Sequence, residues 1–423
     1  MSHENLEQNS TRASKSGRIW LRRFGFITFS GILVLAAVGA YYSTEIKRLH
    51  ALLTLYEEES IAENFRSMDK MIDSKPVWHG GDTWEFERGQ ASLPETFTFD
   101  GEKVNVREFL EYTQTTGLAV LHNDQLVFEE YYLGNTESTP NLSMSVAKSF
   151  VSALVGIAIE EGHIENLMDP VTKYVPALKD SGYDGVPLKH VLQMSSGIRF
   201  NEEYGDFDSD INRMGRMMAF NLPIDEFVAS LENEREPGTY NQYVSMDTQV
   251  LGMVLREATG KDFTSYFEEK LWKPVGMEAD AYWLVDSTQM ELVFFGLNCV
   301  LRDYARLGQL YLHNGRRGDQ QIVPASWVTD SVTPDAPHLQ PGDNPLSQFK
   351  EGYGYQWWLP AEPDGDYLAI GVYNQFIYVH PKHNIVVAKN SANSHYIEDD
   401  YISEAQSIEF FRAIVDKLIA KTE

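Results

Sequence analysis

A serine followed three residues later by a lysine can form a nucleophile and its base. On a helix, side chains three apart lie on one face, so the amine can reach the hydroxyl. If the serine begins the helix, backbone N–H groups and the positive end of the helix dipole stabilise negative charge beside it. If apolar residues surround the lysine, desolvation lowers its pKa, and the neutral amine can accept the serine proton. The chain contains three such pairs: Ser67 with Lys70, Ser145 with Lys148, and Ser347 with Lys350.

Sequence context separates the pair of Ser145 and Lys148 from the other two. Ser145 precedes the apolar run "FVSALVGIAI", which predicts a buried helix over residues 145–161. Ser67 lies in a charged stretch and Ser347 in a loop, so neither of their lysines is expected to be desolvated. A helix cap without chemistry explains the pattern at Ser145 equally well, so the choice depends on motifs elsewhere.

Two stretches in the chain carry a resemblance to a known family. "SVAK" at 145–148 and "PGTYNQYVSMDTQVLG" at 237–252 together resemble the serine β-lactamases and penicillin-recognising hydrolases. Within that family they are most similar to the class C-like esterases and to the 6-aminohexanoate-dimer hydrolases. "VLQMSSGI" at 191–198, "LRDYARLG" at 301–308 and "YGYQWW" at 353–358 are further matches. The resemblance extends from about residue 62 to the C-terminus.

The resemblance implies a role for each matching side chain. Ser145 attacks an ester or amide carbonyl, Lys148 is the base, and Tyr243 passes the proton to the leaving group. The N–H groups of Ser145 and Val372 form the oxyanion hole, and Ser245 binds within the cleft. The sequence leaves open whether Lys148 or Tyr243 takes the first proton.

One element departs from the family pattern. Ala369-Ile370-Gly371 stands where the penicillin-binding members carry Lys-Thr-Gly, which helps to hold a substrate carboxylate. Gly371 still allows the backbone to approach a substrate closely, next to Ile370. The departure disfavours a cell-wall D,D-peptidase or a class C β-lactamase and retains acyl transfer to a linear amide or ester. A non-catalytic penicillin-binding-like receptor is a further alternative.

Several other residues are candidates for binding or for packing. Tyr355, Trp357 and Trp358 could form an aromatic wall of the cleft or pack in the core. Residues 201–210 hold five carboxylates, Asp206 among them, and form either a solvated loop or a site that attracts the ammonium end of a substrate. The lone Cys299 lies in an apolar setting typical of a buried thiol.

The N-terminal region predicts a membrane anchor. Residues 24–42 form an uncharged stretch of nineteen residues after five Lys and Arg side chains, which predicts a cytoplasmic tail over 1–23 and a transmembrane helix over 24–42. A cleaved signal peptide is the alternative. A helical stalk over 43–75 and a hydrolase domain over 76–423 would follow, on the periplasmic side of the inner membrane.

The predicted fold class is α/β (α+β) and β-lactamase-like. Alternating residues over 117–134 predict a hairpin that turns at 123–124, the stretches within 367–390 predict strands, and 403–421 predicts an amphipathic helix. Strands at both ends around a helical insert, at about 165–300, indicate an antiparallel sheet flanked by helices. The net charge of −27 disfavours nucleic acid. No metal site or cofactor motif is expected, and the oligomeric state is left open.

Overall fold

The computed structural model describes His50 and residues 54–420. Chain contacts divide the protein into residues 1–52 and 53–423, and the second unit holds all the elements given below. The predicted cytoplasmic tail and transmembrane helix, residues 1–42, lie outside the described residues. In the described part, no helix combines the length and the apolar character that crossing a bilayer requires.

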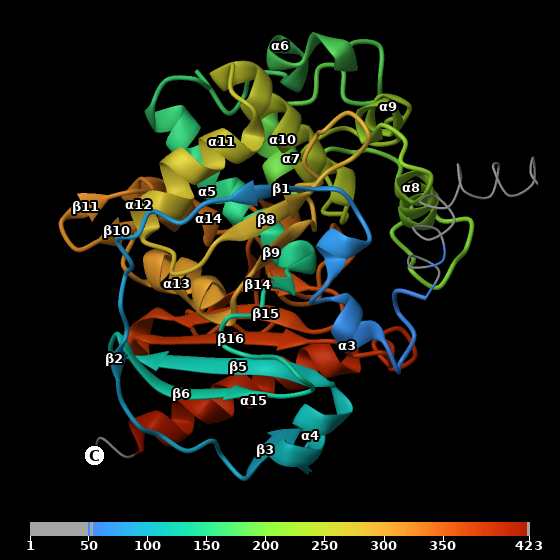
Figure 1. Cartoon of the computed structure of the whole chain (residues 1–423). Helices are drawn as coiled ribbons and strands as arrows, with labels where there is room; N and C mark the ends of the chain where they lie inside the picture. The colour runs from blue at the N-terminus through green and yellow to red at the C-terminus, as the bar shows by residue number, and fades with distance from the viewer. Residues whose placement is uncertain (1–49, 51–53, 421–423) are drawn as a thin grey trace, which may run out of the picture. The chain divides into compact units, whose positions relative to one another are not determined.

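The centre of the folded unit is a sheet that has eight strands within residues 54–420 (Figure 1). Neighbouring strands are antiparallel except β2, which runs parallel to β6. In spatial order the strands are β12 (Gly352–Tyr353), β13 (Trp358–Leu359), β14 (Tyr367–Gly371), β15 (Gln375–His380), β16 (Ile385–Ser391), β5 (Thr115–His122), β6 (Gln125–Tyr131) and β2 (Glu87–Arg88).

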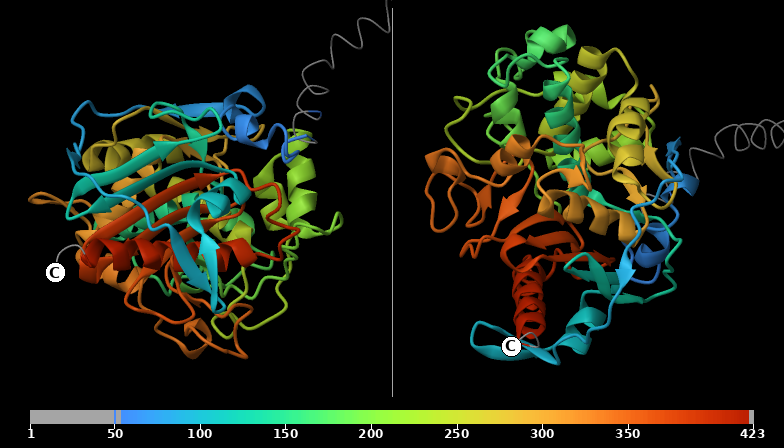
Figure 2. Two further views of the ribbon diagram at one scale, coloured as in Figure 1. Left: turned by 90° about the horizontal axis from the view of Figure 1, so that it is seen from below. Right: turned by 90° about the vertical axis from the view of Figure 1, so that its left-hand side faces the viewer.

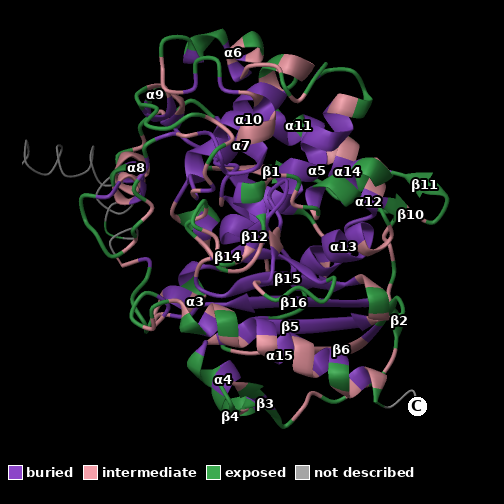
Figure 3. Cartoon of the chain, turned by 180° about the vertical axis from the view of Figure 1, so that it is seen from behind, coloured by how far each residue is buried: buried purple, intermediate pink, exposed green. Residues whose placement is uncertain are grey.

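The predicted strands and hairpin are confirmed. β5 and β6 turn through Asn123 and Asp124, whose φ values are 49° and 64°. Asn and Asp tolerate this left-handed conformation better than most residues, which explains why the chain reverses there. β5 is also paired with β16, with His122 opposite Ile385, so the two ends of the domain meet in the middle of the sheet. The strands β14, β15 and β16 are buried along their whole length (Figure 3).

Helices cover both faces of this sheet. The predicted C-terminal helix is α15 (Ile402–Ile419), which lies across one face beside α4 (Val106–Tyr112) (Figure 2). Phe410 and Phe411 of α15 are fully buried against the apolar side chains of that face. On the opposite face lies α13 (Leu301–Leu312). A Cβ at Gly308 of α13 would lie 2.5 Å from Val386 of β16, so a glycine is needed for this close packing.

The predicted insert at 165–300 contains helices joined by long loops. Its helices are α6 (Val171–Tyr174), α7 (Leu188–Leu192), α8 (Asp210–Ala219), α9 (Ile224–Ala229), α10 (Ser245–Thr259), α11 (Phe263–Phe267) and α12 (Lys273–Val275). Its last part instead forms two strands of a second sheet, which has four strands among the described residues. In spatial order these are β1 (Ser74–Val77), β8 (Ala281–Leu284), β9 (Leu297–Cys299) and β7 (Asn141–Leu142).

The remaining elements include the buried helix that follows Ser145. They are the helices α3 (Ile61–Asn64), α5 (Ala147–Glu160) and α14 (Ala325–Ser331), the strand pairs β3 (Thr96–Phe99) with β4 (Glu102–Asn105) and β10 (Arg316–Arg317) with β11 (Gln320–Gln321), and single helical turns at Met68–Lys70, Met144–Val146, Pro176–Leu178, Glu268–Trp272, Pro337–Leu339 and Pro381–His383.

The stretch predicted as a stalk, 43–75, differs from that prediction where the structure describes it. Residues 54–75 form short helical turns and β1, packed on the folded unit, instead of one exposed helix. Ile61 and Met68 are fully buried, and the Tyr56 ring stacks on Tyr373 with 4.7 Å between ring centroids. The prediction gave weight to the charged side chains, but the apolar ones between them anchor this stretch to the body.

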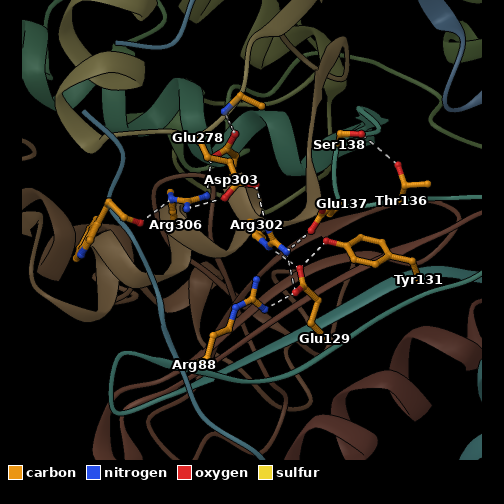
Figure 4. Close-up of polar contacts among 12 residues, drawn as sticks. Arg88, Glu129, Tyr131, Thr136, Glu137, Ser138, Glu278, Arg302, Asp303 and Arg306 are labelled. Carbon is orange, nitrogen blue, oxygen red and sulfur yellow. Dashed lines mark hydrogen bonds and ion pairs between the residues drawn. The ribbon is translucent and has the colours of Figure 1, made fainter. Parts of the chain in front are cut away.

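An ion-pair network fixes α13 in place (Figure 4). Arg302 binds Glu129 of β6 through two nitrogens, at 2.6 and 2.9 Å. One turn later, Arg306 binds Asp303 at 2.9 Å and Glu278 at 2.8 Å. Arg306 and Asp303 are almost fully buried, so this part of the network lies out of water. The "LRDYARLG" stretch therefore holds the helix against its neighbours.

Candidate active site

Ser145 lies at the entrance of the buried helix α5. It sits in the helical turn Met144–Val146, directly before α5 begins at Ala147. Met144 has a φ of 46°, a left-handed conformation that a side chain of this size rarely adopts outside constrained sites. Ser145 itself is 8% exposed and lines a cavity of about 400 Å³. The turn thus presents the hydroxyl at the surface of the cavity.

Lys148 lies one helical turn further along the chain and is 2% exposed. Its Nζ is 3.0 Å from Ser145 Oγ, 2.7 Å from the carbonyl oxygen of Phe294 and 3.4 Å from Ser245 Oγ. Burial lowers the pKa of Lys148 to about 7, although Glu202 and Asp247 act in the opposite direction. At neutral pH, therefore, a large fraction of the amine is uncharged and has a lone pair available.

The other two serine–lysine pairs provide an internal comparison. Lys70 Nζ is 3.1 Å from Ser67 Oγ, a distance close to that in the buried pair, but this contact is exposed to solvent. Lys350 is exposed and forms an ion pair with Asp343 at 3.5 Å. Distance alone therefore does not distinguish the pair at Ser145. The distinguishing property is the burial of its lysine.

Tyr243 precedes α10 and faces both members of this pair. Its ring centroid is 5.1 Å from Lys148 Nζ, and Tyr243 lines the same cavity as Ser145. Burial, followed by the negative charge of Glu202, raises the pKa of Tyr243 well above its usual value. The phenol is therefore protonated at neutral pH and can donate a proton. Trp358 stacks on the Tyr243 ring at 5.6 Å between centroids.

The end of strand β14 passes directly beside Ser145. A Cβ built on Gly371 would lie 2.9 Å from the carbonyl oxygen of Ser143 and 3.0 Å from the backbone nitrogen of Ser145. Only a glycine allows the strand to come this close. Its neighbours Ile370 and Val372 both line the cavity with Ser145. This proximity is what an oxyanion hole between the N–H groups of Ser145 and Val372 requires.

A carboxylate that the sequence did not single out completes the polar contacts. Ser245, the first residue of α10, donates from Oγ to Glu202 Oε1 at 2.6 Å and from its N–H to Oε2 at 3.0 Å. Tyr204 also donates to Glu202, at 2.9 Å. Glu202 and Tyr204 line the cavity. The only signal in the sequence was the acidic composition of residues 201–210, which is equally typical of a solvated loop.

Among the predicted binding residues, Ile370 lines the cavity, and Ser245 and Gly371 adjoin lining residues without belonging to the described lining. The other three have different contacts. Within residues 54–420, the cavity lining includes Glu202 and Glu203 from the acidic loop but not Asp206, whose carboxylate instead accepts hydrogen bonds from Asn201 and from the Asp208 backbone. Tyr355 packs against Trp327 and Trp357 against Tyr311, with centroid distances of 5.0 and 4.4 Å. Tyr355 and Trp357 therefore belong to the core, and Trp358 is the member of the predicted aromatic run that lines the cavity.

The cavity wall is otherwise aromatic and acidic. Its further lining residues are Phe200, Asn201, Gln348, Phe349, Glu351, Tyr396, Tyr401, Glu404, Ala405 and Ile408. In the part of the chain that the structure describes, no three His, Cys, Asp or Glu side chains are grouped so that they could hold a metal ion. Cys299 is buried, and this burial raises its pKa well above the usual value and suppresses its reactivity.

The fold and this cavity define a serine hydrolase with a β-lactamase-like arrangement of sheet and helices. The Beta-lactamase family model matches residues 105–406, and the chain belongs to that family. The chain is 31% identical to the 6-aminohexanoate-dimer hydrolase of Paenarthrobacter ureafaciens over 296 residues, 68% of this chain and 75% of the relative. The resemblance inferred from the sequence motifs is thereby confirmed.

Two further comparisons extend this result. The chain is 23% identical to the teichoic acid D-alanine hydrolase of Staphylococcus aureus (strain MRSA252), over 63% of this chain and 66% of that protein. The solved structure of the "Putative 6-aminohexanoate-dimer hydrolase from Bacillus anthracis" is similar with a TM-score of 0.72 and 25% identity. That similarity covers 84% of this chain and 96% of the other.

Proposed function

We propose that the protein hydrolyses a linear amide or carboxylic ester through an acyl-enzyme on Ser145. The observation that carries this proposal is the buried Lys148 amine, which lies 3.0 Å from Ser145 Oγ and whose pKa is lowered to about 7. A neutral amine at hydrogen-bond distance can take the hydroxyl proton as the oxygen attacks a carbonyl carbon. The protonated phenol of Tyr243 makes the amine, and not the phenolate, the first proton acceptor.

The proton and the bonds can be followed through one turnover. Ser145 Oγ bonds to the carbonyl carbon while its proton moves to Lys148 Nζ. The resulting oxyanion is stabilised by the N–H groups of Ser145 and Val372, each worth roughly 3 kcal/mol. The bond to the leaving group then breaks, and Tyr243 donates its proton to that group and regains one from Lys148. Water then attacks the carbonyl carbon of the acyl-enzyme. The proton transfers run in the reverse order, so Ser145 regains its proton and the carboxylic acid is released.

The cavity supports a substrate that is not anionic. Glu202, Glu203 and Glu351 line it, and Ala369 and Ile370 occupy the positions at which a substrate carboxylate would otherwise be held. Carboxylates on the wall repel the carboxylate of a penicillin or of a D-alanyl peptide and attract an ammonium group. The names of the two curated relatives, a 6-aminohexanoate-dimer hydrolase and a teichoic acid D-alanine hydrolase, are consistent with amine-bearing substrates.

A substrate screen with full-length protein in detergent tests the proposal. The screen contains p-nitrophenyl esters, linear amides, D-amino-acid peptides and a cephalosporin, with wild type beside Ser145→Ala. Ser67→Ala is the matched control, because it removes a serine at the same spacing from an exposed lysine. We expect turnover of esters or amides that Ser145→Ala abolishes and Ser67→Ala retains. Labelling of a residue other than Ser145 by a fluorophosphonate would refute the mechanism.

We also propose that residues 24–42 anchor the enzyme in the inner membrane with the hydrolase domain outside the cytoplasm. The support is the uncharged stretch of nineteen residues behind a basic segment. Extraction of cell membranes with alkaline carbonate tests this proposal, because an anchored enzyme stays in the pellet. Release of an enzyme shortened at its N-terminus would instead indicate a cleaved signal peptide.

A further inference from the structure

A hydroxyl and a carboxylate lie in line behind Lys148. Ser245 Oγ is 3.4 Å from Lys148 Nζ and 2.6 Å from Glu202 Oε1. The carboxylate is held in place by two more donors, the Ser245 N–H at 3.0 Å and the Tyr204 hydroxyl at 2.9 Å. Glu202 therefore belongs to the same hydrogen-bonded chain as the nucleophile, although it does not touch Ser145.

The number of protons available among Ser145, Lys148, Ser245 and Glu202 fixes the direction of each hydrogen bond between them. A carboxylate can only accept, so the single hydroxyl proton of Ser245 is donated to Glu202. The Ser245 oxygen then faces Lys148 as an acceptor. The carbonyl oxygen of Phe294, 2.7 Å from Nζ, is an acceptor as well. A neutral amine has two N–H bonds and one lone pair. The two acceptors take the N–H bonds, so the lone pair is left for the proton of Ser145.

We propose that Glu202 is a positioning residue, which acts through Ser245 to aim the lone pair of Lys148 at Ser145 and to balance the charge that Lys148 gains. This inference rests on the proposed function. When Ser145 loses its proton, Nζ becomes an ammonium with three N–H bonds, and its third donor points at Ser145 Oγ. The Ser245 hydroxyl donates to the Glu202 carboxylate throughout the cycle. The new positive charge on Lys148 is therefore separated from a fixed negative charge by one hydroxyl group.

Other titratable groups pack around this hydrogen-bonded network or lie further along the cavity. Burial raises the pKa of Asp247 well above its usual value, and it does the same for Tyr183, Tyr204 and Tyr243. The pKa of Glu202 is raised, because burial outweighs the charge of Lys148 and the hydrogen bonds from Ser245 and Tyr204, which act in the opposite direction. Glu203, Glu404 and Tyr401 also line the cavity nearby. Glu202 is the carboxylate bonded directly to Ser245.

The test compares full-length wild type with Glu202→Gln and Glu202→Asp. The readouts are kcat and KM for a neutral p-nitrophenyl ester between pH 5 and 9, per active site titrated with a fluorophosphonate. In Glu202→Gln we expect kcat to fall about tenfold or more with little change in KM. The glutamine amide can donate a hydrogen bond to Ser245, and the Ser245 hydroxyl proton then turns toward the lone pair of Lys148. The acid limb of the pH–rate profile, which is the fall in kcat at low pH, should move to lower pH by about one unit. The reason is that the carboxylate no longer raises the pKa of Lys148.

The controls separate positioning from a merely structural role. Glu202→Asp keeps the charge and should restore the position of the acid limb. Asp208→Asn removes an exposed carboxylate from the same loop, outside the described cavity lining, and should leave both kcat and the acid limb unchanged. An unshifted acid limb in Glu202→Gln, whether or not kcat falls, overturns the inference.

Two measurements keep the test decisive. Titrated active sites count folded molecules only, so partial misfolding of Glu202→Gln does not affect the rates. In a double-mutant cycle with Ser245→Ala, the losses in kcat should be strongly non-additive, because both changes interrupt one chain of hydrogen bonds, and additive losses contradict the inference. Turnover by Ser145→Ala would refute the proposed function itself. An unshifted pH–rate profile in Glu202→Gln, with Ser145→Ala inactive, would refute only the role of Glu202.

Discussion

Replacing Gly371 by alanine should separate catalysis from folding. The added Cβ would lie 2.9 Å from the carbonyl oxygen of Ser143, 3.0 Å from the Ser145 nitrogen and 3.1 Å from Gln375 Cβ. Ordinary contacts for a methyl group begin at about 3.5 Å, so the end of β14 has to move away from Ser145 by about 0.5 Å. Catalytic groups must hold their positions within about 0.5 Å, so this displacement misplaces the Val372 N–H.

The expected magnitude follows from the loss of one oxyanion donor. Such a donor is worth roughly 3 kcal/mol, and its partial loss should lower kcat about 10- to 100-fold. Overpacking of this kind should cost about 1–3 kcal/mol of unfolding free energy, which leaves the protein folded at room temperature. The assay is pre-steady-state release of p-nitrophenol from an ester, which separates acylation from deacylation, together with urea unfolding.

A second glycine provides the matched control. Gly215 lies inside α8, and a Cβ added there would meet no atom within 4 Å. Gly215→Ala should therefore leave kcat unchanged and stabilise the protein by about 0.5–1 kcal/mol, since alanine favours a helix. An unchanged acylation rate in Gly371→Ala would refute the assignment of the end of β14 to the oxyanion hole.

Four other outcomes are expected. For a neutral ester, kcat/KM should fall about tenfold per pH unit below about pH 7, because protonation of Lys148 removes the base, and a flat profile down to pH 5 would contradict this. Lys148→Arg should lower kcat about 10²- to 10⁴-fold, because a guanidinium stays charged; comparable rates in a stopped-flow assay would show that no neutral base is needed. Arg306→Met should cost about 3–5 kcal/mol in urea unfolding by leaving the buried Asp303 unpaired, with kcat retained. Glu351→Gln should raise KM about fivefold for an ammonium-bearing ester and not for its neutral analogue, and equal KM changes would rule out charge recognition.

The sequence predicts the nucleophile because burial leaves a signal in the pattern of residues. Ser67 and Lys70 have the same spacing as Ser145 and Lys148 and nearly the same distance between amine and hydroxyl. The apolar run after Ser145 separates the two pairs without a structure, and the family motif at 237–252 favours a nucleophile over a helix cap. In the same way, β5, β6 and α15 follow from alternation and helical periodicity, whereas Gly371 follows from the resemblance of its strand to the family pattern.

Contacts that join distant segments leave no such signal. Glu202 reaches Ser245 through a loop whose composition is typical of solvated loops, so its role depends on the folded path of the chain. The acceptor from Phe294 is a backbone carbonyl, which any residue could provide. The aromatic run at 355–358 was ambiguous for a related reason: neighbouring residues of an extended chain point to opposite sides, so Trp357 enters the core while Trp358 faces the cavity.

The pairing of β5 with β16 has a consequence for how the enzyme comes into being. A nascent chain that has just passed Lys148 already carries Ser145 and Lys148, but β14, β15 and β16 have not yet been synthesised. Until they are, β5 has no partner on that side and the Ser145 N–H has no strand beside it. The Ser145 N–H therefore gains the strand beside it only once residues 367–391 have been made and paired.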